Sequence, residues 1–159
     1  MRRVVVPGRG GTGKSVLARR IGEVTGLPVT ELDELFWSAD LQATPRPRWE
    51  DTQRALTTAE IWVLDGDLGP YDSLQHRLAA ADTVIILDFG VARCAWRALR
   101  RSRERADFWR CLLGWRRHRR LETIAAVQRW APGAGLHLLS TPRQVDEFLA
   151  TTATSAGQG

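Results

Sequence analysis

The stretch Gly8-Arg9-Gly10-Gly11-Thr12-Gly13-Lys14-Ser15 decides the fold of this chain of 159 residues. It fits the pattern G-x-x-x-x-G-K-[ST], in which glycines let backbone N–H groups turn inward and surround phosphate oxygens. A helix that begins directly after the loop adds the positive end of its dipole. The pattern is that of a phosphate-binding loop, or P-loop. It predicts that Lys14 contacts the β- and γ-phosphates of a nucleotide and that Ser15 binds Mg²⁺.

Lys14 is the only lysine in the chain, whereas the other 22 basic residues are arginines. An ammonium group is a compact charge on a flexible stem, while a guanidinium group is a wide planar fork. The narrow space beside the phosphates of a nucleotide suits the ammonium group. We therefore expect that an arginine at position 14 could not replace the lysine.

The same glycines also fit a dinucleotide-binding pattern, Gly8-x-Gly10-x-x-Gly13, with the acidic Asp33 twenty residues beyond the third glycine. Nothing in that pattern requires a lysine and a serine after the third glycine. A second dinucleotide-binding half would also need a longer chain. The sequence therefore favours the P-loop.

Short apolar runs alternate with helical patterns along the chain. Strands are predicted at 4–6, 29–32, 61–64, 83–87 and 136–139, and helices at 13–26, 49–60, 91–103, 106–119, 121–130 and from 141 onward. Strands that alternate with helices and have no polar face indicate a parallel sheet covered on both faces. We therefore predict an α/β fold of the P-loop NTPase type with a five-stranded parallel sheet.

One domain is predicted over residues 1–151, with the basic segment 93–120 at its edge and a disordered tail at 152–159, where residues are small and polar. The final helix begins with the signature of a capping box. Thr141 fits the N-cap, Pro142 the first helical position, and Gln144 the position that bonds back to the cap.

Composition narrows the environment of the protein. No stretch approaches 18 consecutive apolar residues, so no membrane span is predicted. Cys94 and Cys111 lack the spacing of a metal site or a redox motif, which predicts reduced thiols in a cytoplasmic protein. The net charge of +5 is concentrated in residues 93–120, which hold 11 arginines and two acids.

Acidic residues follow several predicted strands. Asp65 comes directly after the strand at 61–64, where a P-loop protein supplies its second contact to Mg²⁺, often through a water. The alternative is that Asp65 only caps the end of the strand. Asp67 could share this role or contact the substrate, and Asp88 is interpreted as a structural acid.

Asp33 follows the second predicted strand, at the edge of the sheet where ligands of parallel sheets bind. A carboxylate there can orient the hydroxyl group of a phosphoryl acceptor or accept its proton. The alternatives are an N-cap for residues 34–37 and a solvated acid. We interpret Asp33 as a residue of the acceptor site.

Four arginines, Arg93, Arg97, Arg100 and Arg101, recur on one face of a predicted helix. Such a row can stabilise the charge of a phosphoryl group during its transfer. It could also be a solvated face or a surface that binds nucleic acid. A second hypothesis is therefore a nucleotide-binding regulator or NTPase that uses residues 93–120 to bind nucleic acid or a partner protein.

Several segments beyond the loop match one family. They are Leu32-Asp33-Glu34-Leu35-Phe36-Trp37, Thr44-Pro45-Arg46, Trp62-Val63-Leu64-Asp65-Gly66, the run from Arg77 to Asp88, and Trp96-Arg97-Ala98-Leu99-Arg100-Arg101. With these segments the chain resembles the small bacterial P-loop kinases related to adenylate kinase, the group often labelled DNA topology modulation proteins. The resemblance covers residues 1–150.

The resemblance implies an adenylate-kinase-like fold and transfer of the γ-phosphate of ATP, with Mg²⁺, to a small acceptor such as a nucleoside or nucleotide. Arg97 and Arg101 match the spacing of two phosphate-binding arginines of such kinases, and the loop after the last strand, with Thr141, Pro142 and Arg143, would border the adenine. The loop residues implied in nucleotide binding are Gly8, Arg9, Gly10, Gly11, Thr12, Gly13, Lys14, Ser15 and Val16.

The chain departs from these relatives between its two predicted basic helices. Relatives have a lid segment rich in Gly, Arg and Asp there, and this chain keeps only Ser102-Arg103-Glu104-Arg105-Ala106. A lid excludes water and completes the site when it closes. The short segment predicts an open site, a bulkier acceptor, an ATPase that admits water, or a loss of activity.

Overall fold

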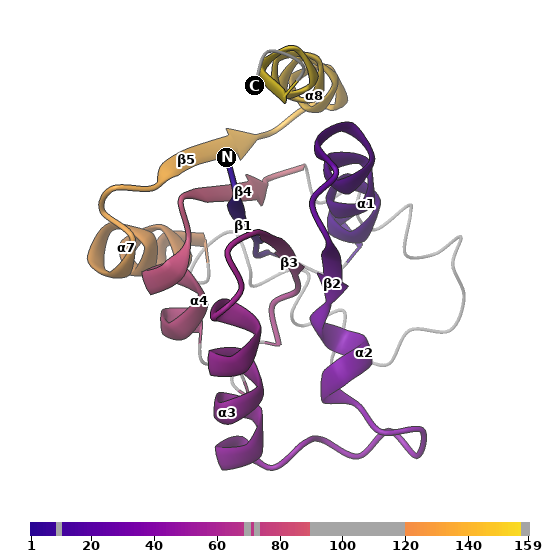
Figure 1. The fold of residues 1–159 in the computed structure, drawn as a ribbon, viewed down its shortest axis with the longest axis vertical. Helices are drawn as coiled ribbons and strands as arrows, with labels where there is room; N and C mark the ends of the chain where they lie inside the picture. The colour runs from indigo at the N-terminus through magenta and orange to yellow at the C-terminus, as the bar shows by residue number, and fades with distance from the viewer. Residues whose placement is uncertain (9–10, 69–70, 72–73, 90–119, 157–159) are drawn as a thin grey trace.

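The computed structural model describes residues 1–8, 11–68, 71, 74–89 and 120–156 (Figure 1). The predicted helices 91–103 and 106–119 lie outside these residues. The elements in chain order are β1 (Arg3–Val6), α1 (Lys14–Thr25), β2 (Val29–Glu31), α2 (Leu32–Phe36), α3 (Arg46–Thr57), β3 (Trp62–Asp65), α4 (Leu74–Ala80), β4 (Thr83–Leu87), α7 (Arg120–Trp130), β5 (Gly135–Leu139) and α8 (Pro142–Ala156).

The strands form one five-stranded parallel sheet in the order β2-β3-β1-β4-β5. The prediction of a five-stranded parallel sheet is confirmed. β1 lies in the centre, and Val6 at its end pairs with Asp65 of β3, which in turn pairs with Glu31 of β2. The carboxyl ends of β1, β2 and β3 therefore meet where the P-loop begins.

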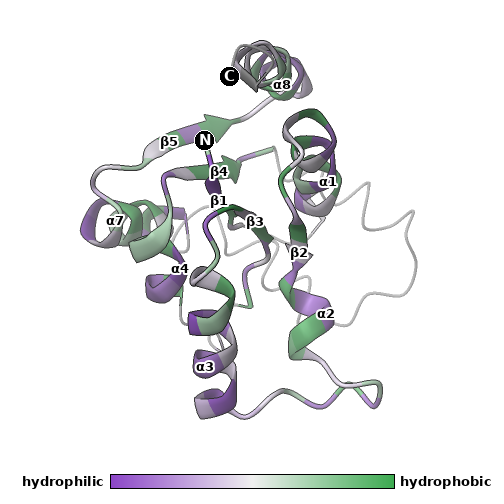
Figure 2. Cartoon of the chain, in the orientation of Figure 1, coloured by the Kyte–Doolittle hydropathy of each residue, from purple (hydrophilic) through white to green (hydrophobic). Residues whose placement is uncertain are grey.

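Helices cover both faces of this sheet (Figure 1). Val4 and Val6 of β1 face one side, where they join the core formed with α1 and α8, while Val5 faces the other side, where α2 and α3 pack. Side chains that alternate between two apolar layers explain why the strands have no polar face. The outer side of α3 is hydrophilic (Figure 2), whereas its Trp49 is fully buried.

The structure differs from the sequence prediction after β2. The strand ends at Glu31, and residues 32–36 form the short helix α2. Leu32 and Phe36 are both buried, and residues four apart share one face of a helix, so the turn buries two apolar groups at once. Asp33 thus lies in the first turn of a helix and not at the end of the strand.

The C-terminal helix confirms one prediction and corrects another. The capping box forms, because the backbone N–H of Gln144 donates to Thr141 Oγ1 and that of Thr141 to Gln144 Oε1, both at 3.2 Å. The predicted disordered tail from residue 152 is wrong as far as Ala156, where α8 ends. The hydroxyl groups of Thr151, Thr154 and Ser155 donate to carbonyl oxygens one turn earlier, so these polar side chains have hydrogen-bond partners within the helix.

A structural carboxylate ties the start of β1 to the start of β4. Asp82 accepts hydrogen bonds from the backbone N–H groups of Arg2 and Arg3, both at 2.9 Å to Oδ2, and from Thr83 Oγ1 at 2.7 Å. Burial of this carboxyl group raises its pKa, but the hydrogen bonds outweigh burial, so the pKa of Asp82 is lowered.

We expect Asp82→Asn to lower the melting temperature at pH 7 by about 2–4 °C, the effect of about 1 kcal/mol in a chain of this size. The lowered pKa means that the stabilisation is complete above the unfolded-state pKa of about 3.9 and is lost as the pH falls through the folded-state pKa. The difference between variant and wild type should therefore shrink toward pH 3. Asp40→Asn, which changes an exposed turn carboxylate, is the control, and an equal effect of both changes would contradict the prediction.

Candidate nucleotide-binding site

The P-loop connects the central strand β1 to helix α1. Gly8, Gly11 and Gly13 have φ angles of 136°, 77° and 95°, a region that side chains strain to adopt. Gly13 is the N-cap of α1, and no side chain caps this helix. The first N–H groups of α1 are therefore presented where the motif holds phosphate oxygens. Arg9 and Gly10 lie outside the residues that the structure describes.

Asp65 is brought to the mouth of this loop by the pairing of β3 with β1. Its side chain is buried, and the residue is only 3% exposed. The hydroxyl group of Ser15 donates a hydrogen bond to its carboxylate, and the charge of Lys14 acts on it. The structure thus brings together three residues that the sequence assigned to one site.

The surroundings of Asp65 disfavour the charged form of its carboxyl group. Burial raises the pKa of its carboxyl group, and this effect outweighs the opposing effects of Lys14 and Ser15. The charges of Glu31 and Asp33 raise the pKa further. Asp65 Oδ1 is buried and has no hydrogen-bond donor among the described residues.

These residues fit a magnesium ion that arrives with a nucleotide. Mg²⁺ prefers oxygen ligands and is usually bound by one or two carboxylates together with phosphates of the substrate. A buried carboxylate oxygen without a donor, next to a serine hydroxyl, offers this chemistry. Within the described ranges no group of three or more His, Cys, Asp and Glu side chains could hold a metal ion. Mg²⁺ usually keeps several waters and binds through one or two carboxylates and the phosphates of a substrate.

Asp33 lies beside this centre, because its charge acts on Asp65. Its side chain is exposed, which leaves it accessible to a second substrate. Glu31 is a neighbour of Asp65 that the sequence does not reveal, because the two residues pair between β2 and β3. Its carboxylate forms an ion pair with Arg19, with 3.0 Å between Glu31 Oε1 and Arg19 Nε. Only the register of β2 against β3 could have revealed this neighbour.

Aromatic side chains lie near Asp33, at the end of α2 and at Tyr71. Trp37 follows one turn later, and its backbone N–H donates to the carbonyl oxygen of Asp33 at 3.2 Å. Its ring lies 4.8 Å from Phe36 and 6.2 Å from Tyr71, measured between centroids. Trp37 and Tyr71 are 37% and 55% exposed. We call Phe36, Trp37 and Tyr71 the aromatic wall. In the sequence, only the spacing of four residues between Asp33 and Trp37 indicates that an aromatic ring lies near Asp33.

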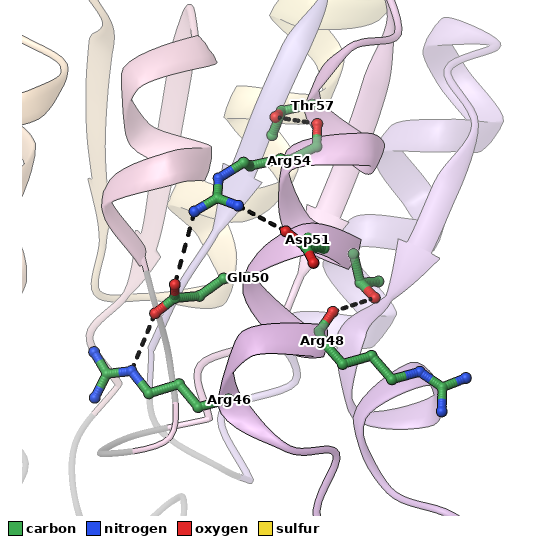
Figure 3. Close-up of polar contacts among 7 residues, drawn as sticks. Arg46, Arg48, Glu50, Asp51, Arg54 and Thr57 are labelled. Atoms are coloured by element: carbon green, nitrogen blue, oxygen red, sulfur yellow. Dashed lines mark hydrogen bonds and ion pairs between the residues drawn. The ribbon is translucent and has the colours of Figure 1, made fainter.

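The outer side of α3 carries a network of charges (Figure 3). Glu50 pairs with Arg46 at 3.1 Å and with Arg54 at 3.7 Å, and Arg54 also pairs with Asp51 at 2.7 Å. Arg48 extends away from this network, and its guanidinium group pairs with no described residue (Figure 3). Arg48 is exposed on the surface of α3.

The turn after Asp65 is fixed by the backbone and by a buried cation. Gly66 has a φ of 142°, and a Cβ atom there would lie 3.0 Å from Leu32 Cβ, so only glycine fits. Arg77 of α4 is fully buried and donates a hydrogen bond from Nη1 to the Gly66 carbonyl oxygen at 3.0 Å. This bond holds the turn between Asp65 and Asp67 in place.

Asp88, at the end of β4, is 5% exposed and pairs with Arg120 of α7 at 3.1 Å. This pairing supports its interpretation as a structural acid. Arg93, Arg97, Arg100 and Arg101 lie outside the described residues, and their roles stay predictions.

A cavity of about 150 Å³ adjoins the P-loop on the side of α1 and α8. Thr12 and Gly13 line one end of it, and Pro142 lines the wall formed by α8. Of the three residues expected to border the adenine, Pro142 lies on this cavity. Arg143 pairs with Glu147 at 2.7 Å, and neither Arg143 nor Thr141 lines the cavity.

Comparison with solved structures identifies the fold. A shikimate kinase from Acinetobacter baumannii, solved with shikimate, superposes with a TM-score of 0.67 at 15% identity over 99% of this chain and 94% of its own. A gluconokinase from Sinorhizobium meliloti gives 0.59 at 20% identity over 99% and 94%. A sugar kinase from Janibacter gives 0.55 at 21% over 97% and 95%. The chain has an adenylate-kinase-like P-loop α/β fold.

Comparison of the sequence itself with known families and curated proteins identifies no relative. No family model matches it, and no curated protein matches it significantly. The likeness to DNA topology modulation proteins therefore stays a resemblance. Among the described residues, no helix has the length and apolar character needed to cross a membrane.

The buried charge of Asp65 predicts a measurable cost to the protein without nucleotide. Asp65→Asn should raise the melting temperature at pH 7.5 by about 2–4 °C, because the amide removes a desolvated charge. Because the folded-state pKa is raised, the buried charge lowers the folding stability by its full amount only above that pKa. This loss of stability vanishes below the unfolded-state pKa of about 3.9. Melting curves at pH 7.5 and pH 4 check this, and a variant less stable than wild type at pH 7.5 would contradict it.

Proposed function

We propose that the protein is an ATP- and Mg²⁺-dependent phosphotransferase that moves the γ-phosphate of ATP to a small acceptor. The observation that carries the proposal is the meeting of Lys14, Ser15 and Asp65 at the mouth of the P-loop, with one buried oxygen of Asp65 lacking a donor. The P-loop kinase fold supports it, since the similar structures are described as kinases of sugars, shikimate and gluconate.

The donor side of the site follows from the loop. Backbone N–H groups from Gly8 to Val16 would surround the phosphates, and Lys14 would neutralise the β- and γ-phosphate charge. Ser15 and Asp65 would hold Mg²⁺, which neutralises phosphate charge when it is bound. Arg97 and Arg101 are proposed to stabilise the transferring group. Thr141, Pro142 and Arg143 are proposed to border the adenine.

The acceptor side is formed around Asp33. In the transfer an acceptor oxygen attacks the γ-phosphorus, the bond from that phosphorus to the β–γ bridging oxygen breaks, and ADP leaves. When the acceptor is a hydroxyl group, its proton passes to the exposed carboxylate of Asp33. When the acceptor oxygen belongs to a phosphate, no base is needed, and Asp33 serves to bind the acceptor.

Two observations support a nucleotide as the acceptor. The exposed rings of Trp37 and Tyr71 lie along the edge that begins at Asp33, and aromatic faces stack well on nucleobases. Arg48 provides a guanidinium group that pairs with no described residue, and guanidinium groups bind phosphate in a two-pronged geometry. A nucleotide has both a planar base and a phosphate, whereas a nucleoside lacks the anion.

The first test is transfer itself. The full chain is incubated with ATP labelled at the γ-phosphate and with a panel of nucleosides, nucleotides and sugars. We expect a labelled acceptor, and we expect Lys14→Arg to lower kcat by at least about 100-fold, as when a residue that stabilises transition-state charge is lost. Circular dichroism and melting curves should show an unchanged fold.

Near-normal turnover by Lys14→Arg would contradict the role of this residue. Hydrolysis of ATP without transfer to any member of the panel would contradict the kinase proposal and favour an NTPase.

Arg48→Ala tests the anionic acceptor. We expect it to raise the KM for a nucleotide acceptor about tenfold, because a charge-assisted hydrogen bond contributes on the order of 1.5–3 kcal/mol. The KM for ATP should stay unchanged. Arg54→Ala is the matched control on the same helix, because its guanidinium group is already paired with Glu50 and Asp51. Equal KM values for both variants would contradict an acceptor phosphate at Arg48.

A further inference from the structure

A second cavity, of about 500 Å³, lies at the edge of the sheet opposite to the P-loop. Its lining residues are Met1, Thr25, Thr83, His137, Phe148, Thr151, Thr152 and Ser155. Met1 precedes β1 and Thr83 begins β4, whereas the P-loop follows the other end of β1. Thr25 is the last of the 12 residues of α1, so about 18 Å of helix separates the cavity from the loop. The cavity is therefore distinct from the candidate nucleotide-binding site, and its volume is that of a small-molecule site.

Hydroxyl groups in this cavity offer acceptors to a ligand. Thr25 Oγ1 donates to a carbonyl oxygen of α1 at 2.6 Å, and Thr83 Oγ1 donates to Asp82 Oδ1 at 2.7 Å. The hydroxyl groups of Thr151 and Ser155 donate to carbonyl oxygens of α8 at 3.0 Å and 3.1 Å. A hydroxyl group has one proton to donate and two lone pairs. Because these protons already have acceptors within the protein, a ligand that reaches these oxygens meets lone pairs.

The cavity also lies where two helices end. Thr25 is the last residue of α1, and Ser155 belongs to the last turn of α8, which packs against α1. The C-terminal end of a helix carries partial negative charge on its carbonyl groups, and a nearby cation is stabilising. The last turns of α1 and α8 contain no basic residue. The ends of both helices therefore favour a positively charged ligand.

The side chains that line the cavity supply no positive charge of their own. Burial lowers the pKa of His137, so its imidazole is neutral at pH 7.5 and keeps one nitrogen lone pair. The N-terminal ammonium group of Met1 acts on the carboxylate of Asp82, which offsets its charge. The ring of Phe148, whose centroid lies 4.8 Å from that of His137, adds an aromatic surface of the kind that attracts cations.

We propose that this cavity binds a small organic cation in which a primary ammonium group is attached to an apolar ring or chain. An ammonium group has three donors and no acceptor, so it complements hydroxyl oxygens whose protons are already used. Its charge matches the two helix ends. The apolar part of the ligand would contact Phe148 and the methyl groups of the threonines. The proposal is independent of the proposed function, because it involves no nucleotide and no residue of the P-loop.

The experiment is an NMR titration of the full chain, labelled with ¹⁵N, without nucleotide or Mg²⁺. The probes are phenethylamine, phenethyl alcohol and hydrocinnamate, which share a phenyl ring on a short chain and end in an ammonium, a hydroxyl and a carboxylate group. We expect phenethylamine to bind at least about tenfold more tightly than phenethyl alcohol, because hydrogen bonds to charged groups are the stronger ones. Hydrocinnamate should bind most weakly. The amide signals of Thr83, His137 and Thr151 should shift.

Thr151→Val removes one acceptor oxygen and keeps the shape of the side chain. We expect it to weaken the binding of phenethylamine about threefold to tenfold and to lower the ratio of amine affinity to alcohol affinity. Thr154→Val is the matched control. Thr154 lies on the same helix and donates in the same way to the Ala150 carbonyl oxygen, at 3.0 Å, but it does not line the cavity.

Ser155→Ala is a second test of the acceptor oxygens, and it should lower the same affinity ratio. It keeps the proposal testable if Thr151→Val destabilises α8, which melting curves of all three variants would show. The two changes lie one turn apart on the helix, and both residues line the cavity.

Four results would overturn the inference. They are equal affinities for phenethylamine and phenethyl alcohol, equal effects of Thr151→Val and Thr154→Val, shifts confined to amides outside the cavity, and no saturable shift with phenethylamine. Failure of the chain to transfer phosphate is distinguishable from these, since it would contradict the proposed function and leave the ammonium preference and its dependence on Thr151 intact.

Discussion

The arrangement of the site depends on one buried carboxylate. Asp65 lies at the end of β3, almost without contact to solvent, and Lys14 and Ser15 compensate its charge only in part. Burying an ion is costly unless partners satisfy it. The sequence around it limits relaxation, because Gly66 follows in a conformation that favours glycine and Arg77 fixes the carbonyl group of that glycine. The fold thus maintains an unsatisfied oxygen where a cation would satisfy it.

The strand order explains why two sides of the site can have different chemistry. Because β1 is central, the P-loop emerges between β3 and β4. On the side of β4 it adjoins the cavity between α1 and α8, whose lining combines apolar side chains with Thr12, Arg20 and Asp146. On the side of β3 and β2 it adjoins Asp33 and the aromatic wall. In the proposed reaction, a nucleotide with its phosphates in the loop would lie between the two regions, and the transferred phosphoryl group would pass close to Lys14 and Asp65.

Local chemistry made part of this predictable from the sequence. The P-loop, the acid after β3 and the capping box of α8 each depend on residues a few positions apart, and the structure has them where the sequence indicated. The sequence predicts a strand that ends just before Asp33, whereas the burial of both Leu32 and Phe36 makes residues 32–36 helical. Glu31 depends on strand register, and the pair Arg20 and Asp146 joins residues 126 positions apart. No local pattern encodes such contacts.

Two acidic residues that look alike in the sequence, Asp82 and Asp65, differ in the hydrogen bonds that their carboxylates accept and in the direction of their pKa shifts. Asp82 lies just before β4 and Asp65 is the last residue of β3. Asp82 has backbone and hydroxyl donors and a lowered pKa, whereas Asp65 has one buried oxygen without a donor and a raised pKa. The first is satisfied by the protein and holds β1 to β4. The second is left for a ligand to satisfy. Asp146 is a third case, an exposed acid whose Oδ1 accepts a hydrogen bond from Arg20 Nη2 at 2.9 Å. Of the three, the buried Asp65 is the one suited to binding a ligand, because its surroundings hold the side chain in place while one oxygen still lacks a partner.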